Sequence, residues 1–287
     1  MSRSWVNGVL LLLVLGLVLL VWLSAREPQI TAPTPLTQLL PEQIASIRIS
    51  NQQGAEISIQ REANRWRMLE PYPVEANETL IRRLLEIAAA PVFTQFTTAQ
   101  NRLAEFGMAP PAAIVHLNQL ELRVGGTDPI NHYRYIGIGD RLYLIKDLFP
   151  HLLLAAAETY VSPKLLPQNA ELDLIQTAEW RLARMPDGPQ VWQLTPADTA
   201  SSMDHLIEKV DEWKYAEAQR VIKPPPGTVI DARVEVRLRD SDATAITFSV
   251  FKLQQSTLLL REDLGLAYDL PRIEALLAAP AAPKMRP

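Results

Sequence analysis

Cysteine is absent from the 287 residues of this chain. Disulfide bonds, thiolate metal sites and cysteine nucleophiles are therefore excluded. A lipoprotein anchor is excluded as well, because there is no cysteine to carry the lipid. The absence is compatible with an oxidising compartment and does not by itself indicate one.

Runs of basic residues are also missing. The chain has 28 Lys and Arg against 32 Asp and Glu, a net charge of −4. A surface that follows nucleic-acid phosphates needs clustered Lys and Arg, so we expect no nucleic-acid partner. The hydrophobic fraction of 48% is ordinary for a chain that buries a core. At ~150 residues per domain the length predicts about two domains.

Recognisable catalytic motifs are absent too. The chain contains no G-x-S-x-G elbow, and no serine–lysine pair stands out. The four histidines never occur at the i, i+4 spacing that holds zinc beside a carboxylate base. They are His116, His132, His151 and His205. We therefore predict no catalytic, metal-binding or cofactor-binding residues and no cofactor.

Two glycine-containing stretches and four tryptophans have alternative interpretations. Residues 125–129 (GGTDP) suggest a phosphate cradle, but no Gly-Lys-Ser/Thr follows, which favours a strand-to-strand loop. Residues 136–140 (IGIGD) indicate a hairpin turn. Core packing is favoured over ligand stacking for Trp66, Trp180, Trp192 and Trp213.

One uninterrupted apolar segment lies near the N-terminus. Residues 5–23 carry no charge and reach ~28 Å as a helix, close to the ~30 Å of a bilayer's hydrocarbon core. Arg3 precedes the segment, whereas Arg26 after it is followed by Glu27. The positive-inside rule then predicts a single-pass protein of the bacterial inner membrane, with a cytoplasmic N-terminus and the bulk of the chain in the periplasm.

A cleaved signal peptide is the alternative, because residues 23–25 (LSA) loosely fit a cleavage site. The apolar core is longer than the 7–15 residues usual for such a peptide, which favours an uncleaved anchor. Either way the bulk of the chain is exported. Four prolines then predict a semi-rigid or disordered spacer; they lie at 28, 33, 35 and 41.

The remaining chain carries an internal repeat. Each copy has a strand that contains a tryptophan and stops at a proline, Trp66 with Pro71 and Trp192 with Pro196, and these spacings differ by one residue. An amphipathic helix follows in each copy, and aligning the tryptophans pairs residues 80–81 with 206–207.

Caps and apolar stripes predict where these helices begin and which faces they bury. Asn77 is the expected N-cap of the first helix, and residues 201–204 (SSMD) resemble a capping box that starts at Ser201. The expected stripe of the second helix comprises Met203, Leu206, Val210 and Trp213.

Segments with period-2 alternation surround each helix and predict antiparallel strands. A short helix closes each copy. The strand segments are 44–50, 55–62, 113–125 and 133–146 in the first copy, and 170–176, 179–185, 234–240, 246–252 and 256–270 in the second; the closing helices are 147–157 and 271–280.

Clusters of strands with helices between them indicate an α+β fold with antiparallel sheets, in two tandem copies after one transmembrane helix. Phe93 and Phe96, after the first helix, are interpreted as sealing the core, and an exposed sticky edge is the alternative. The expected organisation is an anchor (1–24), a Pro-rich linker (25–41), a first repeat (42–165), a second repeat (166–280) and a flexible tail (281–287).

The tryptophan-to-proline strand, the capped helix, residues 103–117 (LAEFGMAPPAAIVHL) and the tyrosine-rich hairpin resemble the family known as domain of unknown function 4340. Residues 106–110 (FGMAP) are similar to its aromatic-glycine-apolar-x-proline signature. Counting both copies, the resemblance covers about 240 residues, although residues 223–236 lack this turn. The family is associated with bacterial ABC-type export and gliding-motility gene clusters, and it supplies no catalytic residues.

The resemblance therefore implies a non-catalytic accessory or scaffold protein near a membrane transporter. Its expected partners are integral membrane proteins, with ABC-type permease subunits as the class that the resemblance implies. Two alternatives stay open: an envelope hydrolase with an unrecognised site, and a glycan-binding or lipid-binding module.

Overall fold

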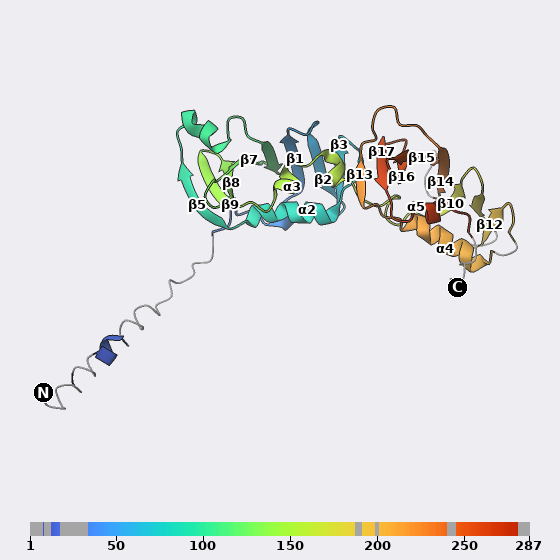
Figure 1. Ribbon diagram of the computed structural model, residues 1–287, viewed down its shortest axis with the longest axis horizontal. Helices are drawn as coiled ribbons and strands as arrows, with labels where there is room; N and C mark the ends of the chain where they lie inside the picture. The colour runs from blue at the N-terminus through green and yellow to red at the C-terminus, as the bar shows by residue number, and fades with distance from the viewer. Residues whose placement is uncertain are drawn as a thin grey trace.

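The computed structural model describes two β-sheet units that follow one another along the chain (Figure 1). The described residues are 8, 13–17, 34–186, 191–198, 201–239 and 245–280. Most of the predicted anchor lies outside them; Gly8 and residues 13–17 are helical. Among the described residues, no helix has the length and apolar character to span a bilayer.

The first unit is a nine-stranded antiparallel sheet with short helices. Its elements are η1 (Pro41–Gln43), β1 (Ser46–Asn51), β2 (Ile57–Glu62), β3 (Arg65–Glu70), β4 (Val74–Glu75), α2 (Glu78–Leu85), η2 (Glu86–Ala89), β5 (Val92–Thr97), η3 (Gln100–Phe106), β6 (Ala113–Leu117), β7 (Leu120–Thr127), β8 (Tyr133–Ile138), β9 (Arg141–Lys146), α3 (Pro150–Leu153) and η4 (Ala157–Tyr160). Alternation decides which side chains reach the core: Ile47 and Ile49 are buried, while Arg48 between them is exposed.

The second unit is an eight-stranded antiparallel sheet. Its elements are β10 (Leu172–Gln176), β11 (Arg181–Arg184), β12 (Trp192–Thr195), α4 (Met203–Lys214), β13 (Arg220–Ile222), β14 (Ala232–Leu238), β15 (Ile246–Leu253), β16 (Ser256–Arg261), β17 (Leu266–Asp269) and α5 (Ile273–Leu277). The expected α+β class with antiparallel sheets is confirmed.

Strand order is the same in both units. The first sheet runs β4-β3-β2-β1-β6-β7-β8-β9-β5, and the second runs β12-β11-β10-β14-β15-β16-β17-β13. Apart from β4, each strand of the first sheet has a counterpart at the same place in the second. In both units the helix after the third long strand packs its apolar side on the sheet.

At the same position in each sheet, a tryptophan ring packs against an arginine side chain of the neighbouring strand. Trp66 in β3 pairs across the ladder with Arg61, and Trp192 in β12 pairs with Arg184. The guanidinium groups lie 5.9 and 4.9 Å from the ring centroids. Both rings are buried, so the expected packing role of these tryptophans is confirmed. Trp180 and Trp213 are buried as well.

A β-bulge explains why the tryptophan-to-proline spacings differ by one residue. In the first sheet Ile59 pairs with Met68, but the adjacent Ser58 pairs with Glu70, so Leu69 is an extra residue. The β11–β12 ladder has no such shift. Pro71 and Pro196, each after a cis peptide bond, therefore follow directly on equivalent strand ends.

The bulge also moves the helix alignment by one residue. The N-caps Asn77 and Ser202 follow their prolines at the same spacing, so Ile81 corresponds to Leu206. The expected pairing of Leu80 with Leu206 is wrong for this reason. Both helices bury equivalent positions: these are Ile81, Leu84, Leu85 and Ala88 in the first unit and Leu206, Lys209, Val210 and Trp213 in the second.

The cap expected on the first helix is confirmed, and that on the second is wrong by one residue. The Asn77 side chain accepts a hydrogen bond from the backbone N–H of Leu80 at 3.2 Å. On α4 the cap is Ser202, whose backbone N–H donates to His205 Nδ1 at 3.3 Å. Met203, expected in the buried stripe, is exposed because it then falls on the first helical position.

Two further expectations need correction: the loop expected at residues 125–129 begins only at Asp128, and the expected core role of Phe93 and Phe96 is wrong. Gly125 and Gly126 lie within strand β7, where a Cβ on Gly125 would stand 2.5 Å from the carbonyl oxygen of Phe106. Close approach of the η3 turn requires a glycine at position 125, and the two glycines form no phosphate cradle. Phe93 and Phe96 do not seal the core: Phe93 is 62% exposed and Phe96 is partly exposed, because β5 is the last strand of its sheet.

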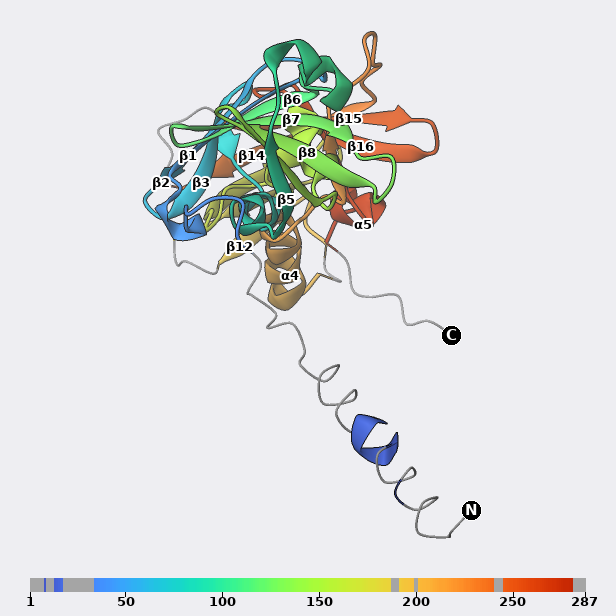
Figure 2. The ribbon, with the colours of Figure 1, turned by 90° about the vertical axis from the view of Figure 1, so that its left-hand side faces the viewer.

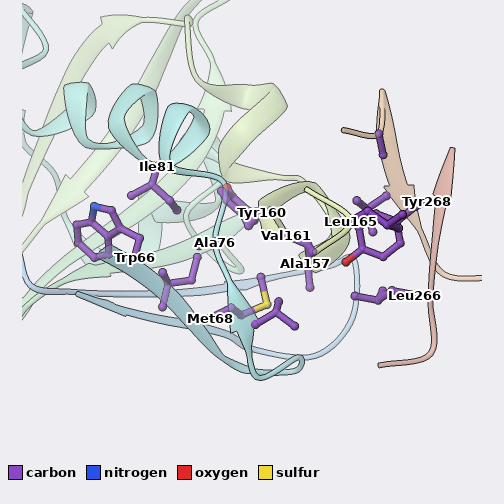
Figure 3. Close-up of a cluster of buried hydrophobic side chains, with 14 of the residues drawn as sticks. Trp66, Met68, Ala76, Ile81, Ala157, Tyr160, Val161, Leu165, Leu266 and Tyr268 are labelled. Atoms are coloured by element: carbon purple, nitrogen blue, oxygen red, sulfur yellow. The ribbon is translucent and has the colours of Figure 1, made fainter. Parts of the chain in front are cut away.

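The segment between the units is partly buried and joins them. Ser162 N–H donates to Glu75 of the first unit at 2.9 Å, and Leu165 N–H donates to Ala216 of the second at 3.0 Å. Figure 3 shows side chains from both units around this segment; those labelled are Trp66, Met68, Ala76, Ile81, Ala157, Tyr160, Val161, Leu165, Leu266 and Tyr268. One hydrophobic cluster therefore spans both sheets.

Candidate interaction surfaces

The histidines lie apart from one another. Among residues 8–280 as described, no group of three or more His, Cys, Asp or Glu side chains is placed to hold a metal ion. His116 Nε2 lies 3.5 Å from a Glu121 oxygen across the β6–β7 ladder, and His205 caps α4. His132 occupies a turn with φ of 57°, and His151 lies in α3.

Three small hollows surround the junction between the units. Their volumes are about 230, 190 and 320 Å³, and all three include Lys164 in their lining. Charged side chains of both signs line them: they include Arg65, Glu75, Glu217, Arg67, Arg261, Glu171 and Lys214. The hollows are shallow polar surfaces around a structural joint.

Tyr72 and Glu158 form a short side-chain hydrogen bond near this joint. The Tyr72 hydroxyl donates to Glu158 Oε1 at 2.5 Å. Burial, and then this carboxylate, raise the pKa of Tyr72 well above its ordinary value. The hydroxyl therefore stays protonated at neutral pH and acts as a donor that ties the β3–β4 loop to η4.

A groove larger than these hollows lies where the chain enters the first unit, and we call it the N-terminal groove. Its volume is about 630 Å³. No lining residue carries a charge; the lining consists of Leu36, Thr37, Gln38, Leu39, Leu117, Asn118, Gln119, Leu120, Ile138 and Tyr143. The sequence carries no local signal for this groove, because its walls come from four separate segments.

One wall of the N-terminal groove is the entering segment itself. Leu36 N–H donates to the Ala90 carbonyl at 2.8 Å, and Val92 N–H donates to the Thr34 carbonyl at 3.0 Å. Leu36 is 4% exposed. Residues 34–41 were expected to belong to the Pro-rich linker. Residues 34–36 instead pair antiparallel with residues 90–92, at the start of β5.

The opposite wall is the β6–β7 turn, which Asn118 holds in place. Asn118 has a positive φ of 55°. Its side-chain oxygen accepts from the N–H groups of Ala45 and Ser46 at 2.9 and 3.1 Å, and its amide donates to the Gln43 carbonyl at 3.0 Å. Both walls are thus fixed by hydrogen bonds, so the groove is formed before any ligand arrives.

The second unit has an equivalent entering segment with different surroundings. Residues 163–165 pair with 216–218 as 34–36 pair with 90–92, and the isolated bridges Lys164–Glu217 and Pro35–Pro91 correspond. In the second unit, however, the hollow beside this segment is lined by charged residues, and Arg67 and Glu75 of the first unit form part of its wall. The uncharged groove is therefore a property of the first unit.

Comparisons with known proteins identify the family. The family described as Domain of unknown function (DUF4340) matches residues 66–224, a shorter stretch than the resemblance implied. The match runs from Trp66 in β3 to Pro224 after β13, and so includes the junction. No curated protein and no solved structure matches the chain. Because the family matches more than half of the sequence, the chain belongs to the DUF4340 family.

Proposed function

We propose that this protein is a membrane-anchored, periplasm-facing accessory or scaffold protein of the bacterial inner membrane. In this proposal its two units arose by tandem duplication, and it acts by protein–protein contact in an ABC-type transport or envelope assembly. The observation that carries the proposal is the N-terminal groove, whose ten lining residues are all uncharged. Preformed apolar surfaces of this kind are typical of sites that bind another molecule.

The position of the groove makes a membrane protein a suitable partner. The predicted span ends at Leu23, and the described residues of the first unit begin at Thr34. A spacer of this length reaches roughly 30 Å if it is fully extended at ~3.1 Å per residue. The groove is then within reach of periplasmic loops of integral membrane proteins, and confinement at the same membrane raises the effective concentration of weak partners.

Residues 13–17 support the anchor. They are helical, and Leu13, Val14, Leu15 and Leu17 are each more than half exposed. Exposed apolar side chains on a helix need an apolar environment such as lipid. Alkaline phosphatase fused to the C-terminus should be active if the bulk of the chain is periplasmic. Activity of a cytoplasm-only reporter at the same place, with the phosphatase silent, contradicts this topology.

The enzyme alternative has less support from the described carboxylates. A catalytic acid usually has a raised pKa. Glu262 has a lowered pKa instead, because Ser249 and then Arg233 donate to it. The pKa of the exposed Glu105 is also lowered, by Arg102. The proposal therefore treats the protein as non-catalytic, with no cofactor.

Affinity capture of the full chain from membranes tests the proposal. Integral membrane proteins should co-purify, with ABC-type permease subunits as the expected class. Leu120→Glu places a carboxylate in the groove and should reduce the captured partner at least about tenfold, because an unpaired buried charge costs more than 1.4 kcal/mol. The matched control, Leu148→Glu, changes an exposed leucine of the same unit outside the groove.

Thermal unfolding of both variants checks that they remain folded. Replacing the anchor with a cleaved signal should also weaken capture while the soluble part stays folded. Capture of a lipid in place of a protein supports the lipid-binding alternative and contradicts the scaffold. Turnover of an envelope substrate by the soluble part, abolished by one polar substitution that leaves it folded, establishes the hydrolase alternative.

A further inference from the structure

Strand β5 ends the first sheet with an open edge. In the described part of the chain its only strand partner is β9. The sole backbone hydrogen bond on its outer side involves Val92, whose N–H donates to Thr34. Residues 93–97 have no described partner there, and Figure 2, which faces this end of the molecule, shows β5 with no strand beyond it.

The β5 edge lacks the features with which proteins usually protect such edges. No residue from 87 to 101 is charged, and no proline occurs between 92 and 101. Charges, prolines and very short strands are what normally prevent pairing between edges. The equivalent β13 has such protection, since it is three residues long and is followed by prolines at 224–226. The long, neutral β5 edge is suited to pairing.

A bulge in β5 places both of its phenylalanines on the outer face of the sheet. The ladder to β9 shifts between Val92 and Thr94, so the usual alternation is interrupted at Phe93. The Phe93 ring lies 4.9 Å from that of Tyr133, and the Phe96 ring lies 6.3 Å from that of Tyr135. The edge therefore carries an aromatic surface beside its open backbone groups.

We propose that β5 pairs with β5 of a second copy of this chain, antiparallel, about a two-fold axis at Gln95. Thr34 already occupies the outer side of Val92, which leaves 93–97 as the free segment. A two-fold axis at its centre is the register that uses all five residues. Gln95 then faces Gln95 of the second copy.

The sequence FTQFT is self-complementary in this register. Thr94 faces Phe96 of the second copy on both sides of the axis, whereas Phe93, which the bulge turns to the outer face, forms no cross-strand side-chain pair. Aromatic residues opposite β-branched ones are favourable cross-strand pairs, and no like charges meet. An isologous two-fold contact of this kind closes as a dimer without producing a filament.

Area and tethering favour a second copy over a segment of another protein. Five paired residues form a small contact, which gives weak association between freely diffusing molecules. In the proposed anchored state both copies share one membrane, and this confinement strengthens a weak symmetric contact. A neutral, self-complementary strand also needs no partner of matching charge. The pairing itself does not rest on the N-terminal groove or its partner.

Cysteine cross-linking of the full chain in membranes tests the pairing, because the chain has no cysteine of its own. Residues that face each other across an antiparallel pair have Cα atoms about 4.5–5.5 Å apart, within the range a disulfide can bridge. Gln95→Cys should therefore form a disulfide-linked dimer under mild oxidation. Gln193→Cys is the matched control, since it is an exposed glutamine on the edge strand β12 and should stay monomeric.

The proposed register allows a second cross-linking test. Thr94→Cys alone should not cross-link, because its Cα atoms would lie beyond the ~7 Å limit, whereas Thr94→Cys expressed together with Phe96→Cys should give a mixed dimer. Gln95→Lys, which opposes two positive charges on the axis, should abolish dimers in light scattering without lowering the thermal midpoint.

Cross-linking of Gln95→Cys no stronger than that of Gln193→Cys overturns the proposal. So does an unchanged oligomeric state of Gln95→Lys. Cross-linking of Gln95→Cys to a different protein shows that another strand occupies the edge, and it overturns the second copy as occupant. These outcomes leave capture through the N-terminal groove unaffected, so failure of the pairing and failure of the proposed function can be told apart.

Discussion

The two units build the same sheet and present opposite ends of it. In the first unit, the end with β5 and the entering segment 34–36 is open and uncharged. In the second unit, the equivalent end with β13 and 163–165 lies against η4 of the first unit. The difference teaches that the β5 end of the sheet is free for contact in the first unit, whereas the equivalent β13 end of the second unit is used to join the two units.

At one equivalent buried position the two helices carry an apolar and a charged residue. Leu84 of α2 is replaced in α4 by Lys209, whose Nζ lies 2.7 Å from the Ala275 carbonyl and 2.5 Å from Glu212. The indole N–H groups of two tryptophans of the second unit donate to the next two carbonyls of the chain. Trp213 donates to residue 276 at 3.2 Å, and Trp180 donates to residue 277 at 2.9 Å. In this way the end of α5 is satisfied by three side-chain donors.

Exchanging the residue types at the equivalent positions 84 and 209 should give the largest change in the free energy of unfolding. Leu84→Lys buries a charge among apolar side chains with no described acceptor, and it should cost several kcal/mol. Lys209→Leu removes a paired charge that can be replaced by an apolar residue, and should cost at most about 2 kcal/mol for the lost carbonyl partner. Denaturant unfolding of both variants measures the asymmetry; equal losses contradict the equivalence of the two sites.

Truncation of the matched tryptophans should give the next largest effect. Trp66→Ala and Trp192→Ala each remove a large buried ring and should cost ~3–5 kcal/mol. Because the rings occupy the same place in each sheet, the two losses should be similar. Chemical denaturation with the parent chain as reference provides the measurement, and a loss below 1 kcal/mol at only one of the sites breaks the comparison.

High pH should destabilise the chain through a tyrosine at the junction. Burial raises the pKa of Tyr160 above its ordinary value of 10.0, so the neutral form is favoured in the folded state. The neutral Tyr160 hydroxyl contributes fully to the free energy of unfolding below pH 10. This contribution is lost as the pH rises, because Tyr160 then ionises only in the unfolded chain. The loss is about 1.4 kcal/mol by pH 11. Thermal midpoints against pH should therefore fall less steeply above pH 10 in Tyr160→Phe, and an equal slope contradicts this assignment.

Deletion of the bulge residue should give the smallest effect. Without Leu69, the spacing from tryptophan to proline in β3 equals that in β12. The deletion should lower the free energy of unfolding by about 1 kcal/mol, as for a typical partly exposed site. Deletion of Gln193 from β12 is the control. It shifts a regular ladder by one residue and turns a buried side chain outward, so it should unfold the second unit. Far-UV circular dichroism distinguishes the two, and loss of structure on deleting Leu69 contradicts the bulge account.

Local patterns predicted the elements of the fold. Alternation located strands such as β1, and the side chain of Asn77 located the start of α2. Packing of the tryptophans also followed from their apolar surroundings. These properties depend on residues close in sequence, which is why a single sequence can indicate them.

Properties that depend on distant partners could not be predicted. The extra residue Leu69 is visible only against the register of β2, and the exposure of Phe93 follows from the place of β5 at the end of the sheet. Lys209 resembles a surface residue until α5 supplies its carbonyl partner. The N-terminal groove needs four segments brought together by the sheet.

Photo-cross-linking at matched positions of the two units tests most directly whether partner contact belongs to the first unit. Leu120 and Ile246 each begin the equivalent strands β7 and β15, and both are partly exposed. A photoreactive residue at 120 of the full chain in living cells should give adducts with an integral membrane protein, and one at 246 should not. Adducts at 246 alone, or at neither position, contradict a partner site in the N-terminal groove.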